Sequence, residues 1–218
     1  MRRLKVFIAY ADEDKSLAGE YKTYLEVHCG FRVFVAHEDN VPARDWMPQI
    51  KENISASDVM AVLISERSKQ SNYVNQEIGI AIGLDIRIFP FMVDGTPPFG
   101  FIDKIHGFPF VKTTELRIVR HCSMFFSVLT TDTEISSNFD YLAVNSVIYA
   151  LSNSPNWKDT NVIINLLTET EKHNNFTKEQ LTSIKSACCS NSEVYGGAYA
   201  YPDFKKLLET KYGIKGLV

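Results

Sequence analysis

The sequence predicts an α/β protein in which a parallel β-sheet with helices on both faces is followed by a helical extension. Three observations predict this class. Short apolar runs alternate with amphipathic helical segments up to about residue 95, and strand-like runs stop after about residue 115. In addition, the run Val59–Ser65 is almost wholly apolar, as buried parallel strands are.

The first half alternates strand and helix with short connections. Strands are expected at 5–11, 32–36, 59–65 and 87–93, and helices at 17–28, 46–54 and 72–84. Pro90 cannot donate to a strand ladder, so the last of these strands is expected at a sheet edge or a bulge. Residues 108–111 are expected to form a short fifth strand.

The second half is expected to be helical. Helices are predicted at 115–130, 139–153, 159–172, 177–189 and 203–212. Thr177 with Gln180 is typical of a capping box, and Gly213 is expected to end the last helix. We therefore predict two domains, residues 1–114 and residues 115–218.

Composition excludes several classes of protein. The 218 residues are 45% hydrophobic and 22% charged, which is ordinary for a globular protein. A net charge of −3 without a basic block argues against a nucleic-acid partner. The four cysteines show no metal-ligand spacing, so no metal is expected, and they suit a reducing, cytoplasmic setting. The longest apolar region, 78–93, is broken by Asp85, Arg87 and Pro90, so no membrane span is expected.

The segment 72–84 organises the chain, because it places a carboxylate on an otherwise apolar helix. Ser71 suits the N-cap, and Tyr73 and Glu77 lie one turn apart on the stripe that continues through Ile80. The opposite stripe is apolar too, so the helix is expected to be largely covered. A covered carboxylate is costly unless a structural donor or a ligand hydroxyl meets it.

Topology places this carboxylate in a crevice. In a flavodoxin-like sheet the strand order reverses between the first and third strands, and ligands bind beyond the carboxyl ends of the strands there. That rule brings five residues around one site: Tyr10, Ala11, Ser65, Tyr73 and Glu77.

The chemistry open to this crevice is narrow. The chain has no G-x-G-x-x-G, no P-loop, no G-x-S-x-G and no paired histidines for a metal. One carboxylate with aromatic neighbours (Tyr10, Tyr73, Trp46) suits a ribosyl ligand. The rings stack on a base, and the carboxylate accepts ribose hydroxyls and stabilises positive charge as a glycosidic bond breaks.

Five segments in order resemble a known family. They are Lys5–Tyr10, Gly30–Phe34, Pro42–Ile50, Val62–Ser65 and Ser71–Glu77. Together they look like a Toll/interleukin-1 receptor (TIR) domain over residues 4–112. The runs Val35-Ala-His-Glu-Asp39 and Pro98-Phe-Gly-Phe101 are similar to stand-alone prokaryotic members.

The resemblance implies a flavodoxin-like fold and cleavage of NAD at the nicotinamide–ribose bond, with NAD as substrate and no other cofactor. It implies that Glu77 is the catalytic glutamate, with Tyr73 as the aromatic residue one turn earlier. Tyr10 and Ala11 match the loop on the nicotinamide side, and Trp46 matches the aromatic after the second-strand loop. Ser65 is a further substrate-binding candidate.

Two positions depart from the family pattern. Arg44 stands where the loop after the second strand usually carries glycine, and Ala11 stands where a polar or basic residue is common. We interpret Arg44 as a residue able to meet a pyrophosphate.

The resemblance also implies a biological setting. Prokaryotic relatives act in antiviral defence, including Thoeris-type systems, where they deplete NAD or make a signal such as a cyclic ADP-ribose isomer for a downstream effector. Self-association through TIR domains is expected.

Two other functions stay open. The chain is alternatively a TIR interaction module that scaffolds other TIR domains without catalysis. It is otherwise a nucleoside deoxyribosyltransferase-like enzyme, since that family shares the flavodoxin-like plan and a glutamate nucleophile. Whether the product is linear, cyclic or conjugated is open as well.

Overall fold

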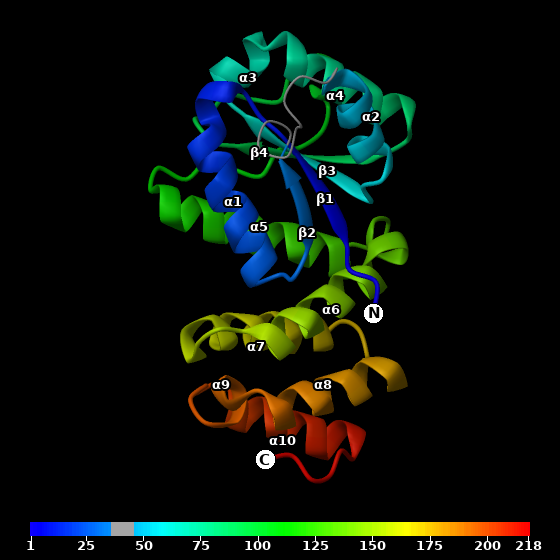
Figure 1. The fold of residues 1–218 in the computed structure, drawn as a ribbon, viewed down its shortest axis with the longest axis vertical. Coiled ribbons are helices and arrows are strands. Elements are labelled where there is room, and N and C mark those ends of the chain that lie inside the picture. The colour runs from blue at the N-terminus through cyan, green and yellow to red at the C-terminus, as the bar shows by residue number, and fades with distance from the viewer. Residues whose placement is uncertain (36–45) are drawn as a thin grey trace. The chain divides into compact units, whose positions relative to one another are not determined.

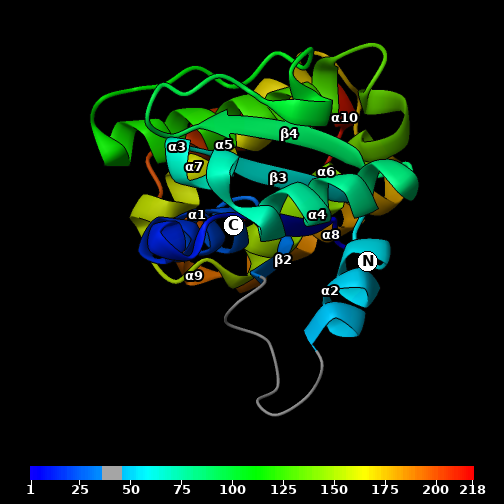
Figure 2. The same ribbon diagram turned by 90° about the horizontal axis from the view of Figure 1, so that it is seen from above.

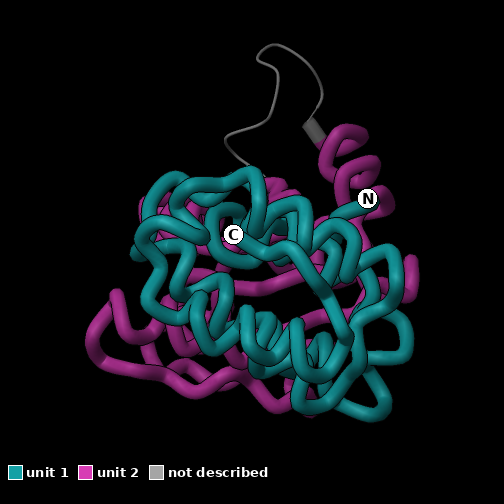
Figure 3. The backbone as a smooth tube through the Cα atoms, turned by 90° about the horizontal axis from the view of Figure 1, so that it is seen from below, with its two compact units in different colours: residues 1–4, 26–31, 126–218 teal, residues 5–25, 32–125 magenta. Residues whose placement is uncertain are grey.

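The structure is a computed structural model, and it describes residues 1–35 and 46–218, with the side chain of Trp46 outside that description. The chain forms two compact units (Figure 3). Unit 2 comprises residues 5–25 and 32–125, and unit 1 comprises residues 1–4, 26–31 and 126–218. The predicted boundary between residues 114 and 115 stays a prediction, because compactness alone does not show which segments fold independently.

Unit 2 is built on a four-stranded parallel sheet of order β2-β1-β3-β4 (Figure 2). The strands are β1 (Lys5–Ala9), β2 (Arg32–Val35), β3 (Val59–Ile64) and β4 (Arg87–Met92). All three pairings are parallel. This is the flavodoxin-like order, so the predicted α/β fold class is confirmed, and every residue of β3 is buried as its apolar sequence predicts.

Helices cover both faces of this sheet (Figure 1). One face packs against α2 (Trp46–Ser55), α4 (Asn72–Gly83) and the short η2 (Gly100–Ile102). The core residues there include Phe7, Met60 and Ile78. On the other face, the rings of Tyr21 of α1 (Lys15–Val27) and Phe125 of α5 (Thr114–Thr131) pack against the Phe91 ring of β4, the first tilted and the second edge-on.

Two details concern the outer edge of the sheet at β4. Pro90 lies in the outer strand of the described sheet, where its missing N–H costs no ladder bond, as predicted. The predicted fifth strand at 108–111 is wrong. Phe108 makes a single parallel bridge to Phe91, donating to the Pro90 carbonyl at 2.7 Å. Residues 109–111 make no further bridge to the described residues, and Pro109 fixes its φ near about −65°, away from the φ of about −120° typical of a parallel strand.

A helix that the sequence analysis missed lies between β3 and α4. The sequence analysis predicts no helix between the strand that ends at residue 65 and the helix that begins at residue 72, but Glu66–Gln70 form α3. Ser65 accepts the Ser68 N–H at 3.0 Å, and the Ser68 hydroxyl accepts the Ser65 N–H at 2.8 Å. This reciprocal cap uses serine where a capping box usually has Glu or Gln, so its signature was not recognised.

Unit 1 is helical. Besides the ends of α1 and α5, it contains α6 (Ser136–Asn153), α7 (Trp157–Glu171), α8 (Lys178–Ser190), α9 (Ser192–Tyr195) and α10 (Tyr201–Tyr212). The predicted helices are confirmed to within a few residues at their ends, and α9 is additional. The Thr177–Gln180 capping box and the left-handed cap at Gly213 are present as predicted.

His121 is buried within unit 2 as a neutral imidazole. Its Nε2 lies 2.9 Å from the Pro109 carbonyl, and its Nδ1 lies 2.7 Å from the Tyr21 hydroxyl. A carbonyl only accepts, so Nε2 carries the proton and Nδ1 accepts from Tyr21. Burial lowers the pKa of His121 to about 4, and the charges of Arg117 and Arg120 act in the same direction.

Acidification from pH 6.5 towards pH 4 is expected to destabilise the protein through His121. The unfolded imidazole takes up a proton near pH 6.5, whereas the folded one stays neutral down to about pH 4. The unfolded state therefore binds more protons in this window, and falling pH favours it. Urea unfolding of the parent and of His121→Gln should show a difference that narrows from pH 7 to pH 5. A difference that is the same at both values would contradict this account.

Candidate functional site

The site begins where β1 and β3 end. These strands are neighbours, with Ala9 opposite Val62, so Tyr10 and Ala11 leave the sheet at the same edge as Ser65. The Ser65 hydroxyl donates to Asp14 Oδ2 at 2.6 Å, which joins the segment after β1 directly to the start of α3. The crevice predicted at the reversal of strand order is therefore bounded by these two segments.

Glu77 lies on the buried face of α4. Ser71 begins this helix by accepting the Val74 N–H at 3.3 Å. Helical spacing then places Val74, Glu77, Ile78 and Ala81 on one face, and all four are buried. The carboxyl group is therefore held among apolar side chains, and only 3% of Glu77 is exposed.

Burial decides the protonation state of Glu77. It raises the pKa of this carboxyl to about 8, because the charged form loses its hydration. Among the residues that the structure describes, Glu77 has neither a hydrogen bond nor an ion pair from its side chain. The sequence analysis allowed either a structural donor or a ligand hydroxyl as the partner of this carboxylate. The described part of the chain supplies no such donor.

The other predicted site residues differ in exposure. Tyr10 and Ala11 are buried, at 1% and 2% exposed, so their side chains face the interior of the unit. Tyr73 is half exposed at the start of α4. Arg44 lies outside the described residues, and so does the side chain of Trp46, whose backbone begins α2.

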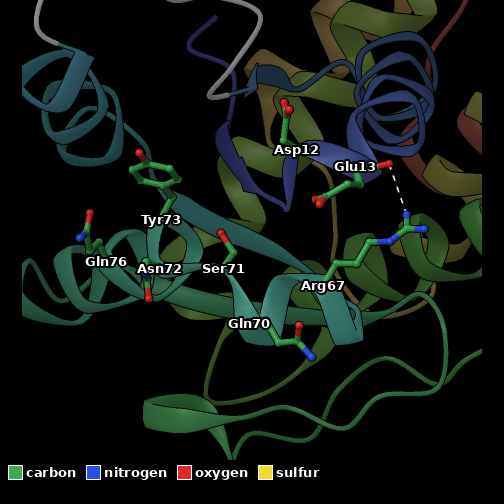
Figure 4. A pocket seen from close by; sticks show the side chains of 8 residues that line it. All are labelled: Asp12, Glu13, Arg67, Gln70, Ser71, Asn72, Tyr73 and Gln76. Carbon is green, nitrogen blue, oxygen red and sulfur yellow. Dashed lines mark hydrogen bonds between the residues drawn. The ribbon is translucent and has the colours of Figure 1, made fainter.

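A pocket of about 750 Å³ opens beside the N-terminus of α4 (Figure 4). Its described walls are Asp12, Glu13, Arg67, Gln70, Ser71, Asn72, Tyr73 and Gln76. Of the predicted site residues, Tyr73 alone lies in these walls. Glu77 lies one turn after Tyr73 on the buried face of the same helix and is not among these walls. The structure therefore places Tyr73 in the pocket walls with Glu77 one turn after it, while Tyr10, Ala11 and Ser65 are buried and lie outside these walls.

Sequence reasoning missed most of the pocket walls. Asp12, Glu13 and Arg67 line the pocket, but none of them was among the predicted site residues. One signal was present in the sequence. Residues that directly follow parallel strands lie at the ligand edge of such a sheet, and Asp12, Glu13 and Arg67 come three or four positions after β1 and β3.

The described residues show neither a metal-binding cluster nor a membrane-spanning helix. Residues 1–35 and 46–218 contain no group of three or more His, Cys, Asp or Glu side chains arranged to hold a metal ion. In the same ranges, no helix combines the length and the apolar composition that crossing a membrane requires.

The fold and the site define a flavodoxin-like α/β protein with its pocket at the reversal of strand order. Comparison with known proteins gives the family: the family model described as "TIR domain" matches residues 6–121, more than half of the 218 residues. The chain therefore belongs to the TIR domain family, and TIR domains commonly self-associate. No curated protein matches the chain.

Solved structures of TIR domains are also similar to the chain. The TIR domain of the Toll-related receptor TRR-2 from Hydra magnipapillata is 21% identical, with a TM-score of 0.47, over 56% of this chain and 96% of that one. The TIR domains in the structure of the activated Roq1 resistosome directly recognizing the pathogen effector XopQ are 16% identical, with a TM-score of 0.38. That match covers 76% of this chain and 98% of the other.

Proposed function

We propose that this TIR protein cleaves NAD at the nicotinamide–ribose bond, with Glu77 as the catalytic carboxylate. One observation carries the proposal: Glu77 is buried among apolar side chains, without a partner in the described residues, one turn from an aromatic ring that lines a pocket. A costly group without a structural role is typical of a functional site.

In the proposed reaction the leaving group, Glu77 and the attacking nucleophile each have a defined role. The bond between ribose C1′ and the pyridinium nitrogen breaks, and its electron pair leaves with neutral nicotinamide. Glu77 stabilises the positive charge that develops on the ribose. A water oxygen then bonds to C1′ and releases a proton, which gives ADP-ribose. If an adenine nitrogen attacks in place of water, the product is a cyclic ADP-ribose.

The raised pKa of Glu77 fits a cationic substrate. With an empty pocket the carboxyl is mostly neutral at pH 7, since its pKa is about 8. A pyridinium cation nearby favours the carboxylate and lowers that pKa. NAD in its oxidised form carries this charge, whereas the reduced form does not. The proposal therefore expects selectivity for the oxidised cofactor.

The test is incubation of the purified protein with NAD beside Glu77→Gln, followed by chromatography. We expect free nicotinamide from the parent alone, and the co-product will distinguish a linear from a cyclic product. Because TIR domains commonly self-associate, the test includes high protein concentrations. Absence of nicotinamide from the parent at every concentration would reject the proposal.

A scaffold role in TIR–TIR assembly is the second candidate. It is favoured by Phe101, which follows β4 with 81% of its surface exposed, as an apolar contact residue would be. Assembly without nicotinamide release would support this role over catalysis. The family match favours either TIR function over a nucleoside deoxyribosyltransferase-like enzyme.

The biological setting that we propose is antiviral defence signalling of the Thoeris type, in which a nucleotide product reaches a downstream effector. This part of the proposal depends on the family resemblance and on NAD cleavage together.

A further inference from the structure

Arg67 is held at the edge of the pocket by the segment that follows β1. Its Nη1 donates to the Glu13 carbonyl at 3.5 Å and to Asp14 Oδ1 at 3.3 Å (Figure 4 shows the first contact). The other Asp14 oxygen accepts the Ser65 hydroxyl, so Asp14 is itself fixed. The Arg67 side chain nevertheless remains 60% exposed, and within the described residues its hydrogen bonds use Nη1 alone. The guanidinium is therefore held in position through Nη1. Its other N–H groups make no hydrogen bond within the described residues and can donate to a ligand.

Arg67 is the one cation among the described pocket walls. The remaining lining side chains are the carboxylates Asp12 and Glu13, uncharged amides, the Ser71 hydroxyl and the Tyr73 ring. An anionic group in this pocket has Arg67 as its charged partner, and a guanidinium matches the geometry of a phosphate better than an ammonium does. The N-terminus of the twelve-residue α4 lies in the same walls and also favours negative charge.

The walls are ordered along the pocket. Tyr73 lies at one side, Arg67 at the other, and Ser71 between them (Figure 4). A ligand with a flat ring at one end and a phosphate at the other fits this order. The carboxylates of Asp12 and Glu13 then serve as acceptors for sugar hydroxyls, which explains two acidic side chains in a pocket for an anion.

We propose that Arg67 binds the phosphate attached to the 5′-oxygen of the nicotinamide riboside half of the substrate. The inference rests on the proposed NAD cleavage and goes beyond it, because it assigns the direction in which the substrate lies: nicotinamide towards Tyr73 and Glu77, phosphate towards α3. The sequence analysis interpreted Arg44 as the residue that contacts the pyrophosphate, and Arg44 lies outside the described residues. Arg67 is a binding residue, and Asp14 positions it.

The experiment compares substrates with and without the phosphate. Cleavage of NAD, nicotinamide mononucleotide and nicotinamide riboside is measured for the parent, Arg67→Gln and Lys69→Gln. Lys69 is the matched control, because it lies two residues away on α3, pairs with Glu66 and is not among the pocket walls. Binding of ADP-ribose to the full chain, measured by calorimetry, provides a readout that requires no cleavage.

We expect Arg67→Gln to lower kcat/KM about tenfold for NAD and for the mononucleotide, the size of one charged hydrogen bond, and to leave the riboside unchanged. ADP-ribose should bind about tenfold more weakly to Arg67→Gln, and added salt should weaken the parent more than the variant. Lys69→Gln should match the parent throughout.

The outcomes distinguish failure of the proposed phosphate site from failure of the proposed cleavage reaction. Equal losses for all three substrates, or none, would overturn the role of Arg67 while cleavage stands. If no substrate is cleaved but ADP-ribose binds in an Arg67-dependent way, the phosphate site stands and the proposed reaction falls. Absence of ADP-ribose binding to the parent would overturn the phosphate site.

Discussion

Glu77→Gln is expected to raise the stability of the protein at pH 7 while abolishing NAD cleavage. The folded protein keeps this carboxyl neutral up to about pH 8, whereas the unfolded chain ionises it near pH 4.5. Between these values the unfolded state binds fewer protons, so stability falls as pH rises. At pH 7, about 2.5 units above the unfolded pKa of 4.5, the cost is at most about 3.5 kcal/mol, from about 1.4 kcal/mol per pH unit, and a glutamine removes it.

The pH dependence of this gain in stability is a more specific test than its size at pH 7. Thermal or urea unfolding of parent and variant should differ little at pH 4, increasingly between pH 4.5 and pH 8, and constantly above that. Taking the difference at each pH cancels the contribution of His121. Glu52→Gln is the control, since it removes an exposed carboxylate on α2 and should show no such gain. A Glu77→Gln variant that is less stable than the parent at pH 7 would show that the carboxylate has a structural partner.

The activity arm uses the same variant. A carboxamide has nearly the size of the carboxyl group but carries no charge for the developing ribosyl cation, so cleavage should fall at least about a hundredfold. A variant that is both more stable and inactive would show that the buried carboxyl is kept for its chemistry. A stabilised variant with full activity would instead remove Glu77 from the mechanism.

Gly30→Ala is expected to destabilise unit 1 severely. Gly30 has a φ of +66°, and a Cβ there would lie 1.9 Å from the Ser146 carbonyl oxygen of α6. This oxygen belongs to helix backbone, so it cannot move away as a flexible side chain would. The strained φ and the overlap together should cost about 3–5 kcal/mol, at the upper end for one substitution.

Two glycine variants separate the causes. Gly213→Ala keeps the positive φ of 66° but meets no atom within 4 Å, so it should cost about 1–2 kcal/mol from backbone strain alone. Gly19→Ala lies inside α1 with open space, and it should stabilise by about 0.5–1 kcal/mol. Urea unfolding of the three variants measures the order. A Gly30→Ala cost no larger than that of Gly213→Ala would show that the backbone around Ser146 adapts.

Ser146 also explains why unit 1 includes two early segments of the chain. Its hydroxyl accepts the Leu4 N–H at 2.8 Å, and its carbonyl faces Gly30. In the same unit, the Phe31 ring lies 6.4 Å from the Phe126 ring. Residues 1–4 and 26–31 thus pack with helices more than ninety positions later, which no local pattern predicts.

The local patterns predicted most of the fold. The apolar run of β3 required burial on both faces, and Pro90 required an outer strand. Thr177 with Gln180 and Gly213 marked helix ends through hydrogen bonds and a φ that neighbouring residues determine. Even the position of Glu77 on a covered helix followed from helical periodicity. In each case the physical cause lies within about one helical turn or one strand, so the sequence contains it.

The tertiary structure alone decided the remaining features. The burial of Tyr10, the anchoring of Arg67 by Asp14, and the close approach of Gly30 to Ser146 are contacts between residues 53 to 116 positions apart, or depend on such contacts. The pocket walls are likewise brought together by the pairing of β1 with β3. The sequence determined which segments are strands and helices and which carboxylate is buried, because these depend on local hydrogen bonding and hydrophobic periodicity. Which cation faces the pocket was decided by packing between distant segments.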